Sequence, residues 1–313
     1  MTLADLGPWA NHLWQSTLFT GAAALLAWAL RKDRAAARFG LWMAASLKFL
    51  IPFSVVVKAG SRLAWIPMAP AAPRTGFSVA VGEMSEPFAR ATASLAPAAA
   101  SVNWLPATLI ALWAAGAAVV AFNWWRRWSR LRATFRASSP LALEGLDLAA
   151  RSCRSLAEPG VFGIFRAVLL VPDGMVDRLA PAQFAAILAH ERCHVRRRDN
   201  LWAAMHMLVE AIFWFHPLVW WVERQLVRER ERACDEEVLR LGSDPEAYAE
   251  GILRVCQWYV ESSLVCAAGV TGIDLKNRIE EIMTRRTTHP LSAGKKLLLA
   301  AAGAAAVAAP LAV

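Results

Sequence analysis

Residues 187–200 read ILAHERCHVRRRDN and contain the pattern H-E-x-x-H at 190–194. Two imidazoles four residues apart on a helix project from the same face about one turn apart, so His190 and His194 can bind one metal ion. Glu191 lies beside them, where a carboxylate can take a proton from water. The alternative is a chance match on a charged surface helix, and the apolar residues that precede the motif on one face disfavour it.

A catalytic zinc ion needs a third protein ligand and an open position for water. We predict Glu231 as this ligand. It lies in a predicted helix in register with an apolar stripe, and a carboxylate at a core-facing position is costly unless it is paired or binds a metal. The alternative is an ordinary solvated carboxylate. The stripe consists of Val227, Cys234, Val238 and Leu241.

Other acidic residues surround Glu231 on the same predicted helix. Asp235 follows one turn later on the same face, where it can orient a metal-binding histidine. Glu229 is the rival ligand, but its side of the helix continues into further glutamates and is expected to be solvated. If Glu231 is not the ligand, the next candidates are Glu210, Glu229 and His206.

The composition points to a membrane protein. Of 313 residues, 57% are hydrophobic and 15 are Trp, and the mean hydropathy of +0.36 is unusual for a soluble globular chain. The formal charge is +9, but many basic residues lie at the ends of apolar runs and are not interleaved with aromatic residues. This pattern indicates membrane topology, and we expect no direct binding of nucleic acid. None of the five cysteines forms a C-x-x-C pair, so we expect buried, reduced thiols.

Four apolar runs approach or exceed the roughly 20 residues that a helix needs to cross a bilayer. By the positive-inside rule, the basic clusters after the first and third runs face the cytoplasm, so the N-terminus is outside. We therefore predict two transmembrane helices in 1–58 (8–30 and 39–57), a flexible outer loop at 59–103, a third transmembrane helix at 104–125, a cytoplasmic domain at 126–296, and a fourth transmembrane helix at 297–313.

Residues 201–222, LWAAMHMLVEAIFWFHPLVWWV, are also apolar, but a full crossing would put His194 and Glu231 on opposite sides of the bilayer. Pro217 would interrupt a continuous helix. We expect this segment to pack under the catalytic helix and to dip partly into the inner leaflet. Earlier in the chain, 161–172 is predicted to form one or two strands. The role of Lys48, inside the second run, is left open.

H-E-x-x-H followed by E-x-x-x-D on a later helix resembles the gluzincin membrane proteases. The finer pattern is similar to the BlaR/MecR peptidase family, which comprises the antibiotic-sensing receptors and their relatives. The resemblance covers most of residues 1–296 and rests on the ordered combination of several stretches. They are LKFLIPFS (47–54), GIFRAVLLVP (163–172), ILAHERCHVRRRDN (187–200), FHPLVWW (215–221) and RERERACDEEVL (228–239).

The resemblance implies a mainly α membrane protein with a cytoplasmic α+β gluzincin domain between the third and fourth spans. It also implies one zinc ion held by His190, His194 and Glu231, with Glu191 as the base and Asp235 orienting a ligand. We expect the chain to lack the penicillin-binding sensor domain that follows the fourth span in the antibiotic receptors.

The activity that the resemblance implies is that of a zinc metalloendopeptidase in the bacterial inner membrane. Its expected substrate is a cytoplasmic protein such as a transcriptional repressor, with self-cleavage as a second outcome. The alternative is a catalytically silent receptor or scaffold that keeps the protease fold. A homodimer is left open, and so is the group that stabilises the oxyanion, for which Tyr248 is one candidate.

Overall fold

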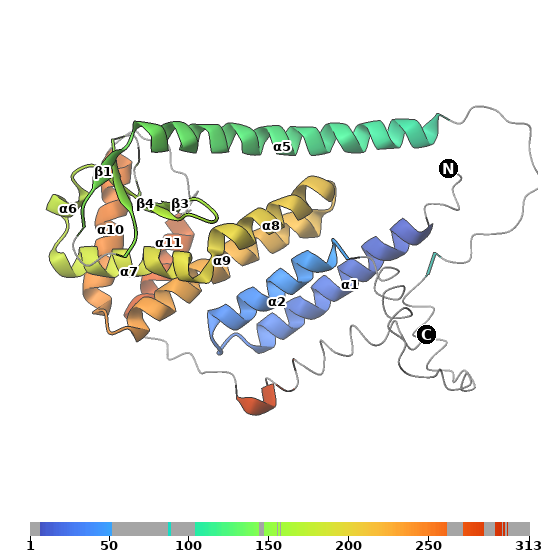
Figure 1. Cartoon of the computed structure of the whole chain (residues 1–313). Helices are drawn as coiled ribbons and strands as arrows, with labels where there is room; N and C mark the ends of the chain where they lie inside the picture. Colours follow the sequence, from blue (N-terminus) through green and yellow to red (C-terminus); the bar gives the residue numbers. More distant parts are fainter. Residues whose placement is uncertain are drawn as a thin grey trace, which may run out of the picture.

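The computed structural model describes residues 7–51, 87–88, 104–143, 147–154, 156, 158–261, 272–284, 292–295, 297 and 299. The described part is mainly helical, with one small mixed sheet (Figure 1). Almost all of the expected outer loop, 59–103, lies outside the described residues. The same is true of the fourth expected span, 297–313, apart from positions 297 and 299.

Helices α1 (Gly7–Ala29) and α2 (Ala35–Lys48) form a hairpin (Figure 1). Their bounds overlap those of the first two predicted spans, 8–30 and 39–57. Residues 52–57 of the second predicted span lie outside the described residues. The burial pattern of α1 is the reverse of that in a water-soluble helix, because its polar side chains are buried and its large apolar ones are exposed. This arrangement is typical of a helix that faces lipid. The buried side chains include Asn11, His12, Ser16 and Thr20, and the exposed ones include Trp9, Leu18, Leu25 and Trp28.

Helix α5 (Leu105–Ala137) runs along one side of the molecule (Figure 1). Among the described residues, it is the one helix that is both long and apolar enough to cross a membrane. None of its side chains is buried. It continues well past residue 125, so the predicted domain boundary at 126 falls inside a continuous helix.

The sheet has the order β1-β2-β4-β3, in which β2 and β4 are parallel and the other pairs are antiparallel. The stretch 161–172, predicted as one or two strands, forms two, joined by a tight turn. Leu169 and Val171 of β4 pack against Ile187, which attaches the sheet to the helix that carries H-E-x-x-H. The strands are β1 (Ser139–Leu141), β2 (Ala150–Cys153), β3 (Gly160–Phe162) and β4 (Val168–Pro172).

The helix with the H-E-x-x-H motif is α7 (Pro181–Arg197), which follows the short α6 (Met175–Arg178). Proline is well suited to the first turn of a helix because the missing N–H has no partner there. The opposite face of α7 packs on α10 (Pro245–Glu261) and α11 (Gly272–Met283), where Ala186 joins Tyr248, Ile252 and Ile282 in a buried cluster. The H-E-x-x-H motif is thus held between a sheet and a layer of helices.

Residues 201–222 form parts of two helices, α8 (Asp199–Ile212) and α9 (Pro217–Arg240), joined by a turn. The tip of this helical hairpin packs against α5, where the Trp113 Nε1–H donates to the Ile212 carbonyl at 2.8 Å. The Trp214 ring lies so close to Gly116 that a Cβ there would stand 2.1 Å from it. The tip therefore reaches the middle of the third apolar run.

Candidate metal centre

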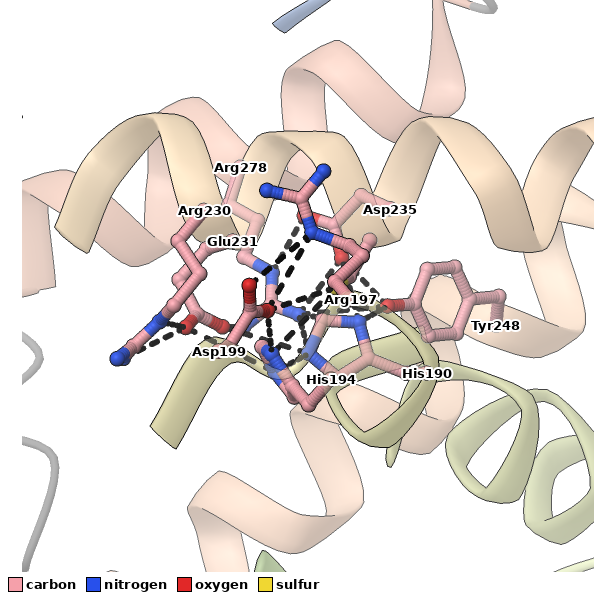
Figure 2. A network of polar contacts seen from close by, with 10 residues as sticks. His190, His194, Arg197, Asp199, Arg230, Glu231, Asp235, Tyr248 and Arg278 are labelled. Atoms are coloured by element: carbon pink, nitrogen blue, oxygen red, sulfur yellow. Dashed lines mark hydrogen bonds and ion pairs between the residues drawn. The ribbon is translucent and has the colours of Figure 1, made fainter. Parts of the chain in front are cut away.

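Helices α7 and α9 bring the three predicted ligands together (Figure 2). The Nε2 atoms of His190 and His194 are 3.1 Å apart. The Glu231 carboxylate lies 3.3 Å from Nε2 of His190 and 3.8 Å from Nε2 of His194. Two ligand atoms about 2.0–2.1 Å from a tetrahedral zinc ion would lie roughly 3.3 Å from each other. The spacing and the chemistry of these donors fit a zinc ion.

The other ring nitrogen of each histidine faces a carboxylate. Nδ1 of His190 is 3.1 Å from Oδ1 of Asp235, and Nδ1 of His194 is 2.7 Å from Oδ2 of Asp199. A carboxylate at Nδ1 favours the tautomer with its proton there, which leaves the Nε2 lone pair free to bind a metal. Both imidazoles are therefore oriented with Nε2 toward Glu231.

The electrostatics of the cluster favour positive charge. Burial lowers the pKa of His190, but hydrogen bonds to Asp235 and Glu231 outweigh it and raise the pKa to about 10. Burial opposes ionisation of Glu231, yet its contact with His190 and the charge of Arg230 hold its pKa well below the usual value. Two carboxylates thus stabilise a cation at this point, and a metal ion would satisfy the same demand.

Arg278 and Tyr248 complete the surroundings of Asp235. The Arg278 guanidinium donates from Nε at 2.8 Å and from Nη2 at 2.7 Å to the two carboxylate oxygens. The hydroxyl of Tyr248 donates to Oδ1 of Asp235 at 2.5 Å. Tyr248 is only 1% exposed, and its hydroxyl contacts Asp235 and His190. It therefore acts as a buried hydrogen-bond partner of these residues rather than as an oxyanion donor.

Asp199 and Arg278 were not predicted as site residues. Asp199 carries a weak sequence signal, because it follows His194 by five residues inside the quoted stretch. Arg278 carries none, since it reaches the cluster from α11, 43 residues beyond Asp235.

Glu191 is buried on α7. Among the described residues, it makes no hydrogen bond or ion pair with the cluster. The histidines outside the motif lie elsewhere: His12 contacts the Phe49 carbonyl, His206 contacts Ser46, and His216 contacts Thr17. His289 lies outside the described residues.

A second group of potential ligands shares His194 with the first. His194, Asp199 and Cys234 offer atoms within 4.8 Å of one another. The Nδ1 contact of His194 with Asp199 already explains this grouping. Cys153, Cys193 and Cys234 are buried, as expected for small apolar side chains, and Cys256 is half-buried.

The environment predicted for Glu229 is wrong. Glu229 is 5% exposed and forms an ion pair with Arg38 of α2, whose Nη2 lies 2.7 Å from Oε2. The predicted apolar stripe fails at both ends, since Val227 is 39% and Leu241 is 58% exposed. The buried side of α9 is turned toward α2, which packs along it (Figure 1). The periodicity of α9 alone could not reveal that neighbour.

Comparisons with known proteins show what this chain is similar to. The sequence profile of the family described as BlaR1 peptidase M56 matches residues 11–282. Regulatory protein BlaR1 of Bacillus licheniformis is 27% identical over 150 residues, which are 46% of this chain and 25% of that protein. Methicillin resistance mecR1 protein of Staphylococcus aureus is 26% identical over 102 residues, 32% of this chain and 17% of that protein. The chain therefore spans a quarter or less of the length of these relatives.

Proposed function

Because the chain belongs to the BlaR1 peptidase M56 family, we propose that it is an integral membrane zinc metalloendopeptidase of the gluzincin type. His190, His194 and Glu231 are the proposed zinc ligands. The observation that carries the proposal is their convergence from two helices, with all three donor atoms within 4.8 Å of one another. The spacings H-E-x-x-H and E-x-x-x-D support the gluzincin type.

A zinc ion bound at this site supplies Lewis-acid chemistry, by which water is activated and a peptide carbonyl is polarised. Glu191 is the proposed general base. It accepts a proton from the attacking water as the new C–O bond forms, and it delivers that proton to the leaving amine as the C–N bond breaks.

Carboxylates behind the two imidazoles hold them in place. Asp235 and Asp199 each accept a hydrogen bond from Nδ1, so both Nε2 atoms stay turned toward the ligand position. Arg278 neutralises Asp235, and its charge contributes to lowering the pKa of that carboxyl to about 2 although burial opposes this. Asp235 is therefore ionised at neutral pH.

We propose the membrane arrangement predicted from the sequence. Residues 1–58, 104–125 and 297–313 carry the four spans, 59–103 is an outer loop, and 126–296 is a cytoplasmic protease domain in the bacterial inner membrane. The exposed apolar surfaces of α1 and α5 support contact with lipid. The polar interior of α1 supports it as well, because polar groups in a bilayer must find partners inside the protein.

The proposed role is regulatory, with a cytoplasmic protein such as a transcriptional repressor as substrate and self-cleavage as a second outcome. The names of the relatives, a regulatory protein and a methicillin resistance protein, support this role. We propose no direct contact with nucleic acid, and a homodimer as an assembly to be tested. A silent receptor or scaffold is the second candidate, favoured by the lack of a described contact between Glu191 and the cluster.

Zinc content and proteolysis of Glu191→Gln distinguish the two candidates. The variant should bind as much zinc as the wild type, because Glu191 is not among the three converging donors. Cleavage of casein and self-cleavage should fall about 10²–10⁴-fold, the usual contribution of a general base. Elemental analysis and gel electrophoresis give the two readouts, with His190→Ala as the zinc-free control. Equal cleavage by wild type and variant would refute the mechanism, and a zinc-loaded but inactive wild type would favour the scaffold.

A further inference from the structure

The turn between β3 and β4 exposes apolar side chains. Gly163 has a φ of 101°, a conformation that favours glycine. An added Cβ there would lie 2.2 Å from the Arg166 carbonyl oxygen, so only glycine closes this turn. The turn directs Ile164 and Phe165 outward, where they are 46% and 90% exposed. Turns in water usually carry Gly, Asn, Asp or Ser at such positions.

This turn is anchored to the catalytic domain. The Asn200 Nδ2 amide donates to the Val161 carbonyl at 3.0 Å and to the Gly163 carbonyl at 2.9 Å. Asn200 lies in the first turn of α8, directly after the helix that carries H-E-x-x-H. The exposed tip therefore has a fixed position relative to the candidate metal centre.

An aromatic stack joins the β3–β4 hairpin to α5. Phe162, at the end of β3, stacks on Phe135 of α5 with ring centroids 4.9 Å apart. Figure 1 shows the closed end of the β3–β4 hairpin pointing toward α8, away from the rest of the sheet. Phe165 is three residues beyond Phe162 in the chain. An aromatic and basic belt on α5 includes Trp128, which precedes Phe135 by seven residues of helix, roughly 10 Å.

The belt itself has the composition of a membrane–water interface. Trp125 and Trp128 are exposed, and the Arg132 guanidinium lies 4.8 Å from the Trp128 ring centroid. Tryptophan and arginine gather where a spanning helix leaves the hydrocarbon core. Arg166, next to the exposed Phe165, is itself exposed and adds a cation that suits lipid phosphate.

From this placement we propose that Ile164 and Phe165 form a membrane contact, inserted among the headgroups of the cytoplasmic leaflet beside the belt of α5. The inference rests on the proposed membrane placement of α5. Such a contact fixes the edge strand β3 and the metal centre close to the lipid surface. Substrates would then be cleaved in segments presented near the membrane.

Depth-dependent quenching tests this contact. Phe165→Cys is labelled with bimane in the full-length protein, which is reconstituted in phosphatidylcholine bilayers with or without lipid that carries a nitroxide near the headgroup. Val119→Cys, on the exposed surface of α5, reports the span. Ala182→Cys, exposed at the start of α7, reports the water-facing part of the domain. The unsubstituted protein, treated identically, gives the background from native cysteines.

The label at position 165 should lose most of its fluorescence, as the label at 119 does, while the label at 182 stays bright. Quenching at 119 without quenching at 165 would overturn the membrane contact and leave the span intact. No quenching at either position would overturn both. If position 165 is unquenched by lipid but its emission shifts when casein is added, the tip binds polypeptide and the proposal is wrong.

Discussion

Single carboxylates decide how the two imidazoles of the site are oriented. Asp235 could be predicted, because the E-x-x-x-D spacing puts it on the helical face of Glu231. Asp199 could not be assigned a role in the same way. Arg198, just before it, has a left-handed φ of 55°, and α7 ends there. Helical spacing carries no information across such a break, so its hydrogen bond to His194 required the structure.

The contact of Asp199 with His194 leads to a prediction about zinc affinity. Asp199→Asn removes the charge that favours the Nδ1–H tautomer, so zinc affinity should fall about 10–100-fold, the usual effect of losing such an outer partner. Competition with a chromogenic chelator measures the affinity of the purified protein. Asp177→Asn, an exposed position on α6, is the matched control and should not change it. An unchanged affinity in Asp199→Asn would show that the orientation of His194 is set by other contacts.

At the level of elements, α9 is shared between the candidate metal centre and the hairpin of α1 and α2. Its Glu231 and Asp235 face α7, while its Glu229 and Glu236 face the start of α2. The Glu236 carboxylate accepts the Ala35 N–H at 3.1 Å, and Glu229 pairs with Arg38, which also donates to the Leu30 carbonyl. The existence of this helix was predictable from sequence, but its second buried side was not, because that side is lined with charges.

The joint between α2 and α9 predicts different effects on stability and on zinc. Glu229→Ala leaves the buried Arg38 guanidinium without its carboxylate, which should cost about 3–5 kcal/mol of unfolding free energy. Zinc should remain bound while the protein is folded, because Glu229 is not one of the converging donors. Chemical unfolding in detergent and metal analysis provide the measurements.

The matched control for this joint is the double variant Arg38→Leu with Glu229→Leu. It removes both charges, so its loss of unfolding free energy should be smaller than the sum of the losses caused by the two single changes. Loss of zinc from folded Glu229→Ala would instead make Glu229 the third ligand in place of Glu231.

Across the whole molecule, helices bounded by local signals were predicted best. The first apolar run, 8–30, nearly coincides with α1, and Pro181 begins α7 as expected. What could not be predicted is which side of each helix is covered. The polar face of α1 points inward and the apolar face outward, because its neighbours supply hydrogen-bond partners such as the Phe49 carbonyl for His12. The hydropathy of a segment is an average over both faces of the helix, so it does not show which face is buried.

The last prediction joins the metal site to the membrane topology. Helix α8 leads from the site to a tip beside Trp113, and α9 returns from that tip to Glu231. Each arm is about 15–20 Å long at helical rise, shorter than the roughly 30 Å of hydrocarbon that a crossing requires. Arg198→Cys and Arg228→Cys should therefore react from the same, cytoplasmic side in intact cells. Labelling uses a membrane-impermeant maleimide before and after permeabilisation.

Position 198 lies at the start of the outgoing arm and 228 near the end of the returning arm, and both are exposed. Labelling of the two sites from opposite sides would mean that the segment between them crosses the bilayer. His194 and Glu231 could then not share a metal ion, because ligand bonds of about 2 Å cannot bridge the membrane. Labelling from opposite sides would therefore refute both the proposed topology and the proposed metal centre.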